Sequence, residues 1–460
     1  MQSLSLDQLS AADRLAVHCT SFTFDKLPEQ TVHHTRQVVF DFIGSVLGGY
    51  QTELGRRSTD YVMYARQGDE ATIVGDGRRC AVEGAAWVNA ANSCILGMTE
   101  THRKCGHVAS EIVPAALAIG EQRQLSGKQI ITAIVAGYEV FGAIQPAVRD
   151  YQRTKGLDTK GQVGTLASAV TTGVALGLDA TTLRNALALA TDMACGTEQY
   201  AYDPGLCDTE GLLAGYAAAN GIAAARMAEF GFKGPSGALD GPYGYYSAFG
   251  SGYNADYLEQ LGRQFIIDET ALKPHSGCRH VHACVDATQA LLRTIQPELN
   301  SIVAIEVGTY RNAVTPEFRV NYHPDSVESA GFSLPVTVSV VLARGSWYLE
   351  DIASYTAPEV RRLMPLVTVY EDVTIQSNYP QMNGCIVRVQ TRDEMWHEGR
   401  VNYAKGEPEN MMTAQELEDK FRKLAGNLLP EAQINRLLDL ANRVDELDDI
   451  GELVRATIRP

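Results

Sequence analysis

The pattern of apolar residues changes near residue 268, and this change constrains the fold more than any other feature of the chain. Before it, apolar residues recur at helical spacing in segments joined by short loops. After it come short segments rich in β-branched residues, at 302–307, 367–370 and 385–389. The pattern predicts a mostly α protein, with a large all-helical domain over residues 1–267 and a smaller α+β domain over 268–410.

The first part should be built from closely packed helices. Ser10 is expected to cap the first helix, and the helix that follows Leu27-Pro28 is expected to stop at Gly48-Gly49. The remaining helices have faces rich in Ala and Gly, which lets backbones approach closely. They are predicted at 112–121, 128–143, 164–176, 181–193 and 212–230.

The second part mixes the predicted strands with helices. Residues 286–295 and 332–343 fit helices, although 335–338 fits either a helix or a strand. Helical spacing returns at 413–424 and 431–440, where Thr413 followed by Glu416 forms a capping-box motif. We expect the C-terminal helices, within residues 411–460, to dock back on the helical domain.

The composition argues against several classes of protein. A net charge of −16 opposes binding to nucleic acid, which needs a basic face. No segment approaches the ~18 consecutive apolar residues of a membrane span, and residues 1–7 lack the pattern of a secretory signal. Nine cysteines without paired spacing are typical of reduced thiols. We therefore expect a cytoplasmic protein with neither a nucleic-acid nor a membrane partner.

Two basic segments stand out in this acidic chain, one at 99–107 and one at 273–282, and they hold five of its ten histidines. Each comes just before a predicted helix, where free N–H groups and the helix dipole favour an anion. Two such half-sites facing each other would suit a small dicarboxylate or tricarboxylate. The candidate site residues are Thr101, His102, His107, Lys273, Arg279 and His280.

Other interpretations of these segments are less favoured. His280 and His282 lie near Cys278 and Cys284, but the spacings match no zinc motif, and crowded cations oppose a divalent metal. We therefore expect no metal. The chain also lacks a Walker motif, a dinucleotide fingerprint and a nucleophile elbow. Two solvated loops with incidental histidines remain the alternative to a binding site.

A series of short motifs resembles the MmgE/PrpD family along nearly the whole chain. This family includes 2-methylcitrate dehydratase, cis-aconitate decarboxylase and iminodisuccinate epimerase. The resemblance implies a helical domain with a smaller α+β lid domain, a cleft between them, a homodimer and no cofactor. The motifs are Leu-Pro at 27–28, Phe-Asp-Phe-Ile-Gly at 40–44, Val-Pro-Ala-Ala at 113–116, Phe-Lys-Gly-Pro at 232–235, Leu-Asp-Gly at 239–241, Leu-Lys-Pro at 272–274, Cys-Arg-His-Val-His at 278–282 and Gly-Glu-Pro-Glu-Asn-Met at 406–411.

The family's site residues carry over unevenly. The lysine of the second segment and the histidine and threonine of the first are kept as Lys273, His107 and Thr101. Dehydratases and decarboxylases are expected to carry an aspartate, a histidine and a lysine at three further positions. This chain has Gly97, Asp158 and Glu210 there. Within the resemblance, these differences favour the epimerase branch.

The sequence therefore predicts an isomerase: an epimerase that removes and returns a proton at a carbon α to a carboxylate, on a substrate similar to iminodisuccinate. Lys273 is the first candidate base, because Arg279 and His275 should lower its pKa. His107 is the opposite acid–base group, and Thr101, His102, Arg279 and His280 would hold carboxylates.

Three alternatives remain open. The chain can be a lyase, either a hydro-lyase similar to 2-methylcitrate dehydratase or a decarboxylase of the cis-aconitate type. It can also be a non-catalytic protein that binds carboxylates. Within any enzyme, Lys273 can serve as an electrostatic clamp rather than a base.

Overall fold

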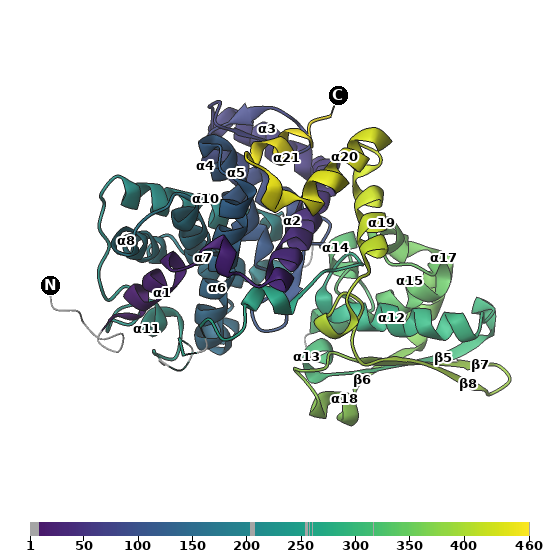
Figure 1. The fold of residues 1–460 in the computed structure, drawn as a ribbon. Helices are drawn as coiled ribbons and strands as arrows, with labels where there is room; N and C mark the ends of the chain where they lie inside the picture. Colours follow the sequence, from purple (N-terminus) through teal and green to yellow (C-terminus); the bar gives the residue numbers. More distant parts are fainter. Residues whose placement is uncertain are drawn as a thin grey trace.

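Two lobes lie side by side in the computed structural model, which describes residues 9–202, 208–253, 256, 258–259, 261–315 and 317–459 (Figure 1). The larger, helical lobe contains the first eleven helices, and the smaller, α+β lobe contains a mixed sheet covered by helices. The predicted fold class is therefore confirmed. The helices of the helical lobe are α1 (Ala11–Thr20), α2 (Glu29–Tyr50), α3 (Glu53–Ala65), α4 (Val82–Cys94), α5 (Ala109–Arg123), α6 (Gly127–Lys155), α7 (Thr159–Ala175), α8 (Ala180–Thr191), α9 (Gln199–Tyr202), α10 (Thr209–Glu229) and α11 (Tyr245–Phe249).

The α+β lobe is built on a four-stranded sheet of order β6-β5-β7-β8. Strand β5 (Ile302–Thr309) pairs in parallel with β6 (Val367–Glu371) and antiparallel with β7 (Cys385–Thr391). The segment at 335–338 is helical. The helices of this lobe are α12 (Arg279–Thr294), α13 (Arg311–Val314), α14 (Val327–Ala330), α15 (Leu334–Arg344), α16 (Leu349–Ile352), α17 (Pro358–Leu363) and α18 (Val373–Ser377).

The fourth strand, β8 (Trp396–Val401), was not predicted from the sequence. It pairs with β7 at the edge of the sheet, and its side chains are mostly exposed or half-buried, so it lacks the apolar pattern of the other strands. Gly399 lets it approach α12, because a Cβ at this position would lie 2.1 Å from the carbonyl oxygen of Ala287.

Helices α2 and α6 run past their predicted ends. Helix α2 continues through Gly48-Gly49 to Tyr50, so these glycines do not end it. They serve close packing instead, because a Cβ on Gly49 would lie 1.9 Å from the Asn92 carbonyl oxygen of α4. Helix α6 extends past the predicted end at residue 143 to Lys155. By length and composition it could cross a membrane. However, 83% of its most apolar window is buried inside the protein, as is usual for a helix of a protein core.

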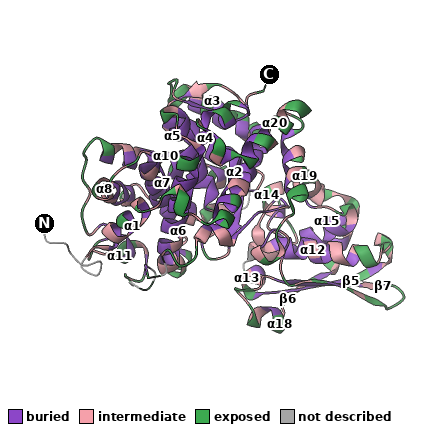
Figure 2. Cartoon of the chain, viewed as in Figure 1, coloured by how far each residue is buried: buried purple, intermediate pink, exposed green. Residues whose placement is uncertain are grey.

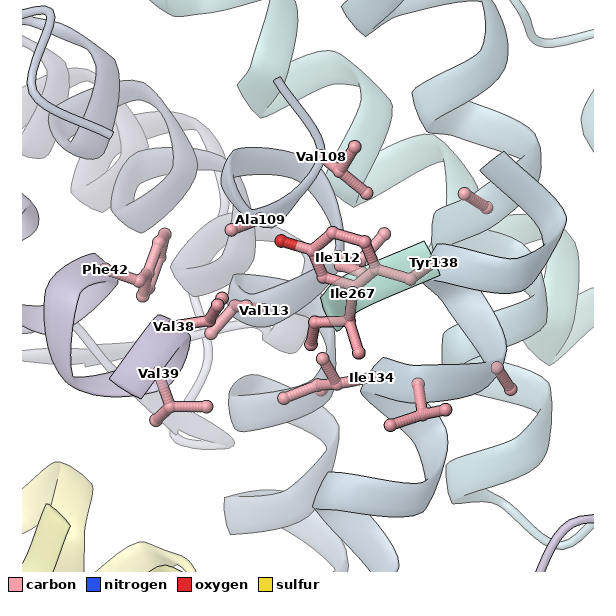
Figure 3. Close-up of a cluster of buried hydrophobic side chains, with 14 of the residues drawn as sticks. Val38, Val39, Phe42, Val108, Ala109, Ile112, Val113, Ile134, Tyr138 and Ile267 are labelled. Carbon is pink, nitrogen blue, oxygen red and sulfur yellow. The ribbon is translucent and has the colours of Figure 1, made fainter. Parts of the chain in front are cut away.

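The apolar cores position these elements. One core joins helices of the helical lobe to the C-terminal helices, and another lies within residues 281–404 of the α+β lobe (Figure 2). Figure 3 shows part of the first core, where the ring of Tyr138 on α6 packs among Ile112, Val108 and Ile267. These buried side chains support the loop that follows α4, which holds the first basic segment.

The C-terminal helices are α19 (Ala414–Ala425), α20 (Glu431–Asn442) and α21 (Gly451–Arg455). The capping box of Thr413 and Glu416 is present at the start of α19. The Phe421 ring of α19 stacks on Phe40 of α2, with ring centres 4.2 Å apart. On the same helix, Lys423 forms an ion pair with Glu350 of the α+β lobe at 2.8 Å. Helix α19 therefore contacts both lobes where they meet (Figure 1).

Candidate active site

A short sheet brings the two basic segments together. Strand β3 (Thr101–His102) pairs antiparallel with β4 (Thr270–Ala271), so Thr101 lies opposite Ala271. Lys273 follows β4 by two residues. Backbone hydrogen bonds therefore place Lys273 beside the first segment, although about 170 residues of chain separate them.

All six predicted site residues line one cavity of about 560 Å³. Its wall contains residues of both lobes, and Tyr200 of α9 contributes to it. Among the described residues, the lining includes seven lysines and arginines and five aspartates and glutamates, an excess of positive charge in a chain of net charge −16. These charged residues are Arg103, Arg149, Arg153, Lys160, Lys273, Arg279, Arg319, Asp158, Glu198, Glu210, Glu328 and Glu407.

Lys273 is buried, and its Nζ donates a hydrogen bond to the Gly277 carbonyl oxygen at 3.0 Å. Burial lowers its pKa to about 8; Cys278 and Glu210 oppose this shift, and Lys420 and Arg279 add to it. Burial is thus the main cause, rather than the neighbouring cations as the sequence suggested. His275 instead hydrogen bonds to Asp286 at 2.9 Å, and neither it nor His282 is part of the cavity wall.

His107 is held in one tautomer. Its Nδ1 lies 2.7 Å from the Glu100 carbonyl oxygen, which can only accept, so Nδ1 carries the hydrogen and Nε2 is left with a free lone pair. Burial, followed by the charges of Lys273 and Lys160, holds the pKa of His107 well below its ordinary value. The imidazole is therefore neutral at pH 7 and able to accept a proton.

The Glu100 side chain fixes the loop that carries His107. Its carboxylate accepts hydrogen bonds from the N–H groups of Val108, at 2.7 Å, and Ala109, at the start of α5. Burial raises the pKa of Glu100 to about 7. The same residue therefore positions His107 twice, through its carbonyl group and through its carboxylate.

The other histidines of the cavity are neutral rather than cationic. Burial lowers the pKa of His102 to about 3. Burial and then the nearby arginines hold the pKa of His280 well below its ordinary value, and its Nδ1 is hydrogen bonded to the Tyr310 hydroxyl at 2.7 Å. These two histidines can therefore offer a ligand hydrogen bonds but not charge.

Arg279 is part of an ion-pair network. It pairs with Glu407, whose other carboxylate oxygen lies 3.2 Å from a guanidinium nitrogen of Arg103. Glu407 is buried, so the network fixes both arginines at the cavity wall. Much of the charge of Arg279 is therefore already balanced by the protein.

Lys160 is a cavity residue that the sequence did not single out. Asp158 caps α7 by accepting from the N–H groups of Lys160, at 2.7 Å, and Gly161, and it accepts from the Tyr200 hydroxyl at 2.8 Å. The Lys160 Nζ lies 3.3 Å from a Glu210 oxygen. Burial opposes its charge, but Tyr200, Glu210 and Asp158 raise its pKa well above the ordinary value.

Lys160 changes the meaning of the substitution at Glu210. The lysine that the family resemblance places at residue 210 is absent, but a lysine from α7 reaches the same part of the cavity. Two sequence features together could have identified Lys160. One is the acidic Glu210 where the family resemblance expects a lysine, and the other is a lysine two residues after Asp158. Sequence alone does not show which two of these groups meet.

Gly97 has no room for a larger residue. Its φ of +60° lies in the left-handed region, and a Cβ there would lie 2.8 Å from the Gly277 nitrogen. An aspartate cannot enter this position unless the backbone moves. Among the described residues, no group of three or more His, Cys, Asp and Glu side chains is arranged to hold a metal ion.

Comparisons with known proteins match both parts of the chain. The family model of the MmgE/PrpD N-terminal domain matches residues 13–258, and that of the MmgE/PrpD C-terminal domain matches residues 275–446. Cis-aconitate decarboxylase of Aspergillus terreus is 24% identical, over 94% of this chain and 92% of the relative. Cis-aconitate decarboxylases of Mus musculus and Homo sapiens are 24% and 23% identical, over 93% of this chain and 89% and 90% of the relatives. With its cavity built from both matched parts, this chain belongs to the MmgE/PrpD family.

Proposed function

We propose that this chain is an enzyme that transfers a proton at a carbon bearing or adjoining a carboxylate, in a small dicarboxylate or tricarboxylate. One observation carries the proposal. His107 and Lys273 line the same cavity in complementary states, a neutral imidazole and an amine whose pKa is about 8. The Lys273 pKa lies near the working pH, where an acid–base group acts most efficiently.

The pKa values favour acid and base roles for Lys273 and His107 that differ from those expected from the sequence. At pH 7 His107 has a free lone pair at Nε2 and acts as the base. Lys273 is mostly an ammonium group at this pH, so it donates the proton and stabilises negative charge that develops on the substrate. Thr101 and Lys160 offer further donors to substrate carboxylates.

A lyase reaction takes first place among the possible outcomes of this proton transfer. The supporting observation is the match, over nearly the whole chain, to proteins named cis-aconitate decarboxylase. In a decarboxylation, the bond between carbon and the departing CO2 breaks, its electron pair stays on the carbon, and Lys273 protonates that carbon. In a hydro-lyase, His107 would remove the proton and Lys273 would protonate the departing hydroxyl.

Epimerisation is the second candidate, and the site residues support it. Gly97, Asp158 and Glu210 replace three groups that the resemblance assigns to dehydratases and decarboxylases, and Gly97 leaves no space for the missing carboxylate. An epimerase needs only a base on one face of the carbon and an acid on the other.

Proton NMR of small dicarboxylates and tricarboxylates incubated with the enzyme in deuterated water tests these outcomes together. A lyase gives a new product that has lost CO2 or water. An epimerase places deuterium at the carbon next to the carboxylate without such a product. If acids that bind are neither consumed nor exchanged, the proposal fails and a non-catalytic binding protein is supported instead.

A further inference from the structure

The charges that line the cavity are not evenly balanced. Around Lys273, the cations Lys160 and Lys273 are offset by Asp158 and Glu210. A second group of cations, Arg149, Arg153 and Arg319, lines another part of the wall. Within the described parts of the chain, none of these three arginines forms an ion pair with a carboxylate. We call them the arginine cluster.

Contacts with neutral oxygens hold the arginine cluster in place. Arg153 of α6 donates to the side-chain oxygen of Asn312 at 2.9 Å, and Arg319 donates to the main-chain carbonyl of the same residue. Asn312 belongs to α13, so guanidinium groups of both lobes meet on one residue. Arg149 donates to the carbonyl oxygens of Arg103 and Lys104, at 3.2 and 3.1 Å.

His280 shows that the fields of these arginines overlap. After burial, the causes that lower its pKa are the charges of Arg319, Arg279, Arg153 and Arg149. Arg279 is balanced by Glu407, whereas the other three arginines are not. Glu198 also lies close to two of them, since Arg153 and Arg319 both lower its pKa against the raising effects of burial and Asp158. Two of the three arginines, together with Lys160, therefore act on this carboxylate.

This arrangement is costly for the empty protein. Arg149 and Arg319 are half-buried, so their charges repel more strongly than they would in water, whereas Arg153 is exposed and better screened. Arg319 also has a buried Nε without a hydrogen-bond partner, and an unsatisfied donor destabilises the fold. The chain has 55 acidic residues to 39 lysines and arginines, so carboxylates are abundant, yet the cluster has none as an ion-pair partner among the described residues. An anionic ligand would offset the repulsion between the arginines.

We propose that Arg149, Arg153 and Arg319 form a subsite for a dianionic group, on the part of the substrate that lies away from Lys273. Three guanidinium groups without an ion-pair partner among the described residues carry more positive charge than one ligand carboxylate can balance, which favours a dianion. Two neighbouring carboxylates and a phosphate monoester share this chemistry, because guanidinium groups bind both through paired N–H donors. That the ligand is the substrate rests on the proposed function; the anion site itself does not.

The test measures binding of malonate, inorganic phosphate and acetate to the full chain by calorimetry at low ionic strength. We expect malonate or phosphate to bind at least tenfold more tightly than acetate. The variants Arg153→Gln and Arg319→Gln should each weaken that binding about tenfold or more. Arg311→Gln is the matched control: Arg311 lies beside Asn312 on α13, but it is exposed and pairs with Glu371 at 2.8 Å. The Arg311→Gln variant should bind malonate or phosphate with the same affinity as the unchanged protein.

Each outcome decides one point. Tighter binding of malonate assigns the subsite to paired carboxylates, and tighter binding of phosphate assigns it to a phosphate ester. If acetate binds as well as the dianions, or if the two glutamine variants bind like Arg311→Gln, the subsite does not exist. Thermal unfolding of the ligand-free variants shows whether each is folded, and Arg153→Lys, which keeps the charge but loses the paired donors, should bind with intermediate affinity.

One further variant separates this inference from the proposed function. Lys273→Ala should keep the affinity for malonate or phosphate, because Lys273 is not part of the arginine cluster. If the unchanged protein turns over none of the carboxylic acids tested but still binds a dianion through Arg153 and Arg319, the proposed function fails and the subsite stands. If turnover occurs without arginine-dependent binding, the reverse holds.

Discussion

His107 and Lys273 owe their protonation states to burial more than to any neighbour. Removing water disfavours the charged form of both bases, which keeps the imidazole neutral and brings the amine close to physiological pH. The carbonyl of Glu100 then chooses the histidine tautomer. At the scale of single residues, the site therefore depends on the loop backbone as much as on the side chains that face the ligand.

Replacing Lys273 by alanine should lower kcat by at least ~10²-fold, because general acid–base groups typically contribute that much. Steady-state kinetics on the substrate found by NMR measures the loss. Lys104→Ala is the control, since Lys104 belongs to the same basic segments but is exposed and pairs with Glu269 at 3.0 Å. A Lys273→Ala variant within threefold of the control would contradict the assignment.

The pH dependence of kcat/KM should show whether Lys273 acts as an acid or as a base. An acid must be protonated, so its contribution is complete below its pKa, which is about 8, and is lost above it. We expect the rate to fall about tenfold per pH unit above that value. A rate that instead rises through pH 8 would make Lys273 the base, as first predicted from the sequence.

Gly97→Asp should not restore the carboxylate that the family resemblance places there. Its positive φ strains any larger residue by about 1–3 kcal/mol, and the new Cβ would also meet the Gly277 nitrogen. Gly177→Asp separates the two effects, because Gly177 has a φ of +71° but nothing within 4 Å of a Cβ. Urea unfolding should show the larger destabilisation at Gly97, and equal losses would refute the steric argument.

Helix α19 contacts both lobes. Its Lys420 is buried, pairs with Asp41 of α2 at 2.5 Å and donates to the Met98 carbonyl oxygen at 2.8 Å. Met98 directly precedes Thr99 of the cavity wall. Helix α19 therefore braces the loop that carries the first basic segment, and it contacts the α+β lobe through Lys423.

Lys420→Met should lower the free energy of unfolding by about 3–5 kcal/mol, because it leaves the buried Asp41 carboxylate without its partner. The double variant Asp41→Asn with Lys420→Met should recover much of that loss, since neither charge remains. Lys423→Met on the same helix removes a more exposed pair and should cost less than about 1 kcal/mol. Chemical denaturation measures all three, and similar losses for the two single variants would contradict this interpretation.

At the scale of the whole molecule, the cavity and its positive charge depend on both lobes. Residues of both lobes form its wall, and lysines and arginines outnumber acids there while the chain as a whole is acidic. An anion that occupies the cavity contacts both lobes at once. Binding should therefore stabilise the complete fold rather than one lobe.

A tricarboxylate such as citrate should raise Tm progressively with its concentration, because a ligand at 100 times its Kd stabilises the folded state by about 2.7 kcal/mol. The rise should shrink in 1 M salt, where charges are screened beyond about 3 Å. Differential scanning calorimetry at both salt concentrations checks this. A Tm that citrate leaves unchanged at low salt would argue against an anion-binding cavity.

Local patterns in the sequence predicted much of the fold and the residues that line the candidate site. Helical spacing, β-branched runs and the capping box at Thr413 depend on residues close in the chain, so they could be recognised without the structure. The basic segments were found for the same reason, and their six candidate residues do share a cavity. The Gly48-Gly49 pair was misinterpreted, because its role depends on Asn92, which lies on another helix.

Only the tertiary structure decided which groups of the site are charged and which charges are paired. Whether Arg279 is free or balanced depends on Glu407, more than a hundred residues away, and the lysine that meets Glu210 comes from a different helix. Burial, which makes the histidines neutral, is also a property of the folded chain. The sequence by itself determined which charges were present, and it indicated many of the helices and three of the four strands of the main sheet. The folded structure determined which charges are paired, because pairing is set by distance in space.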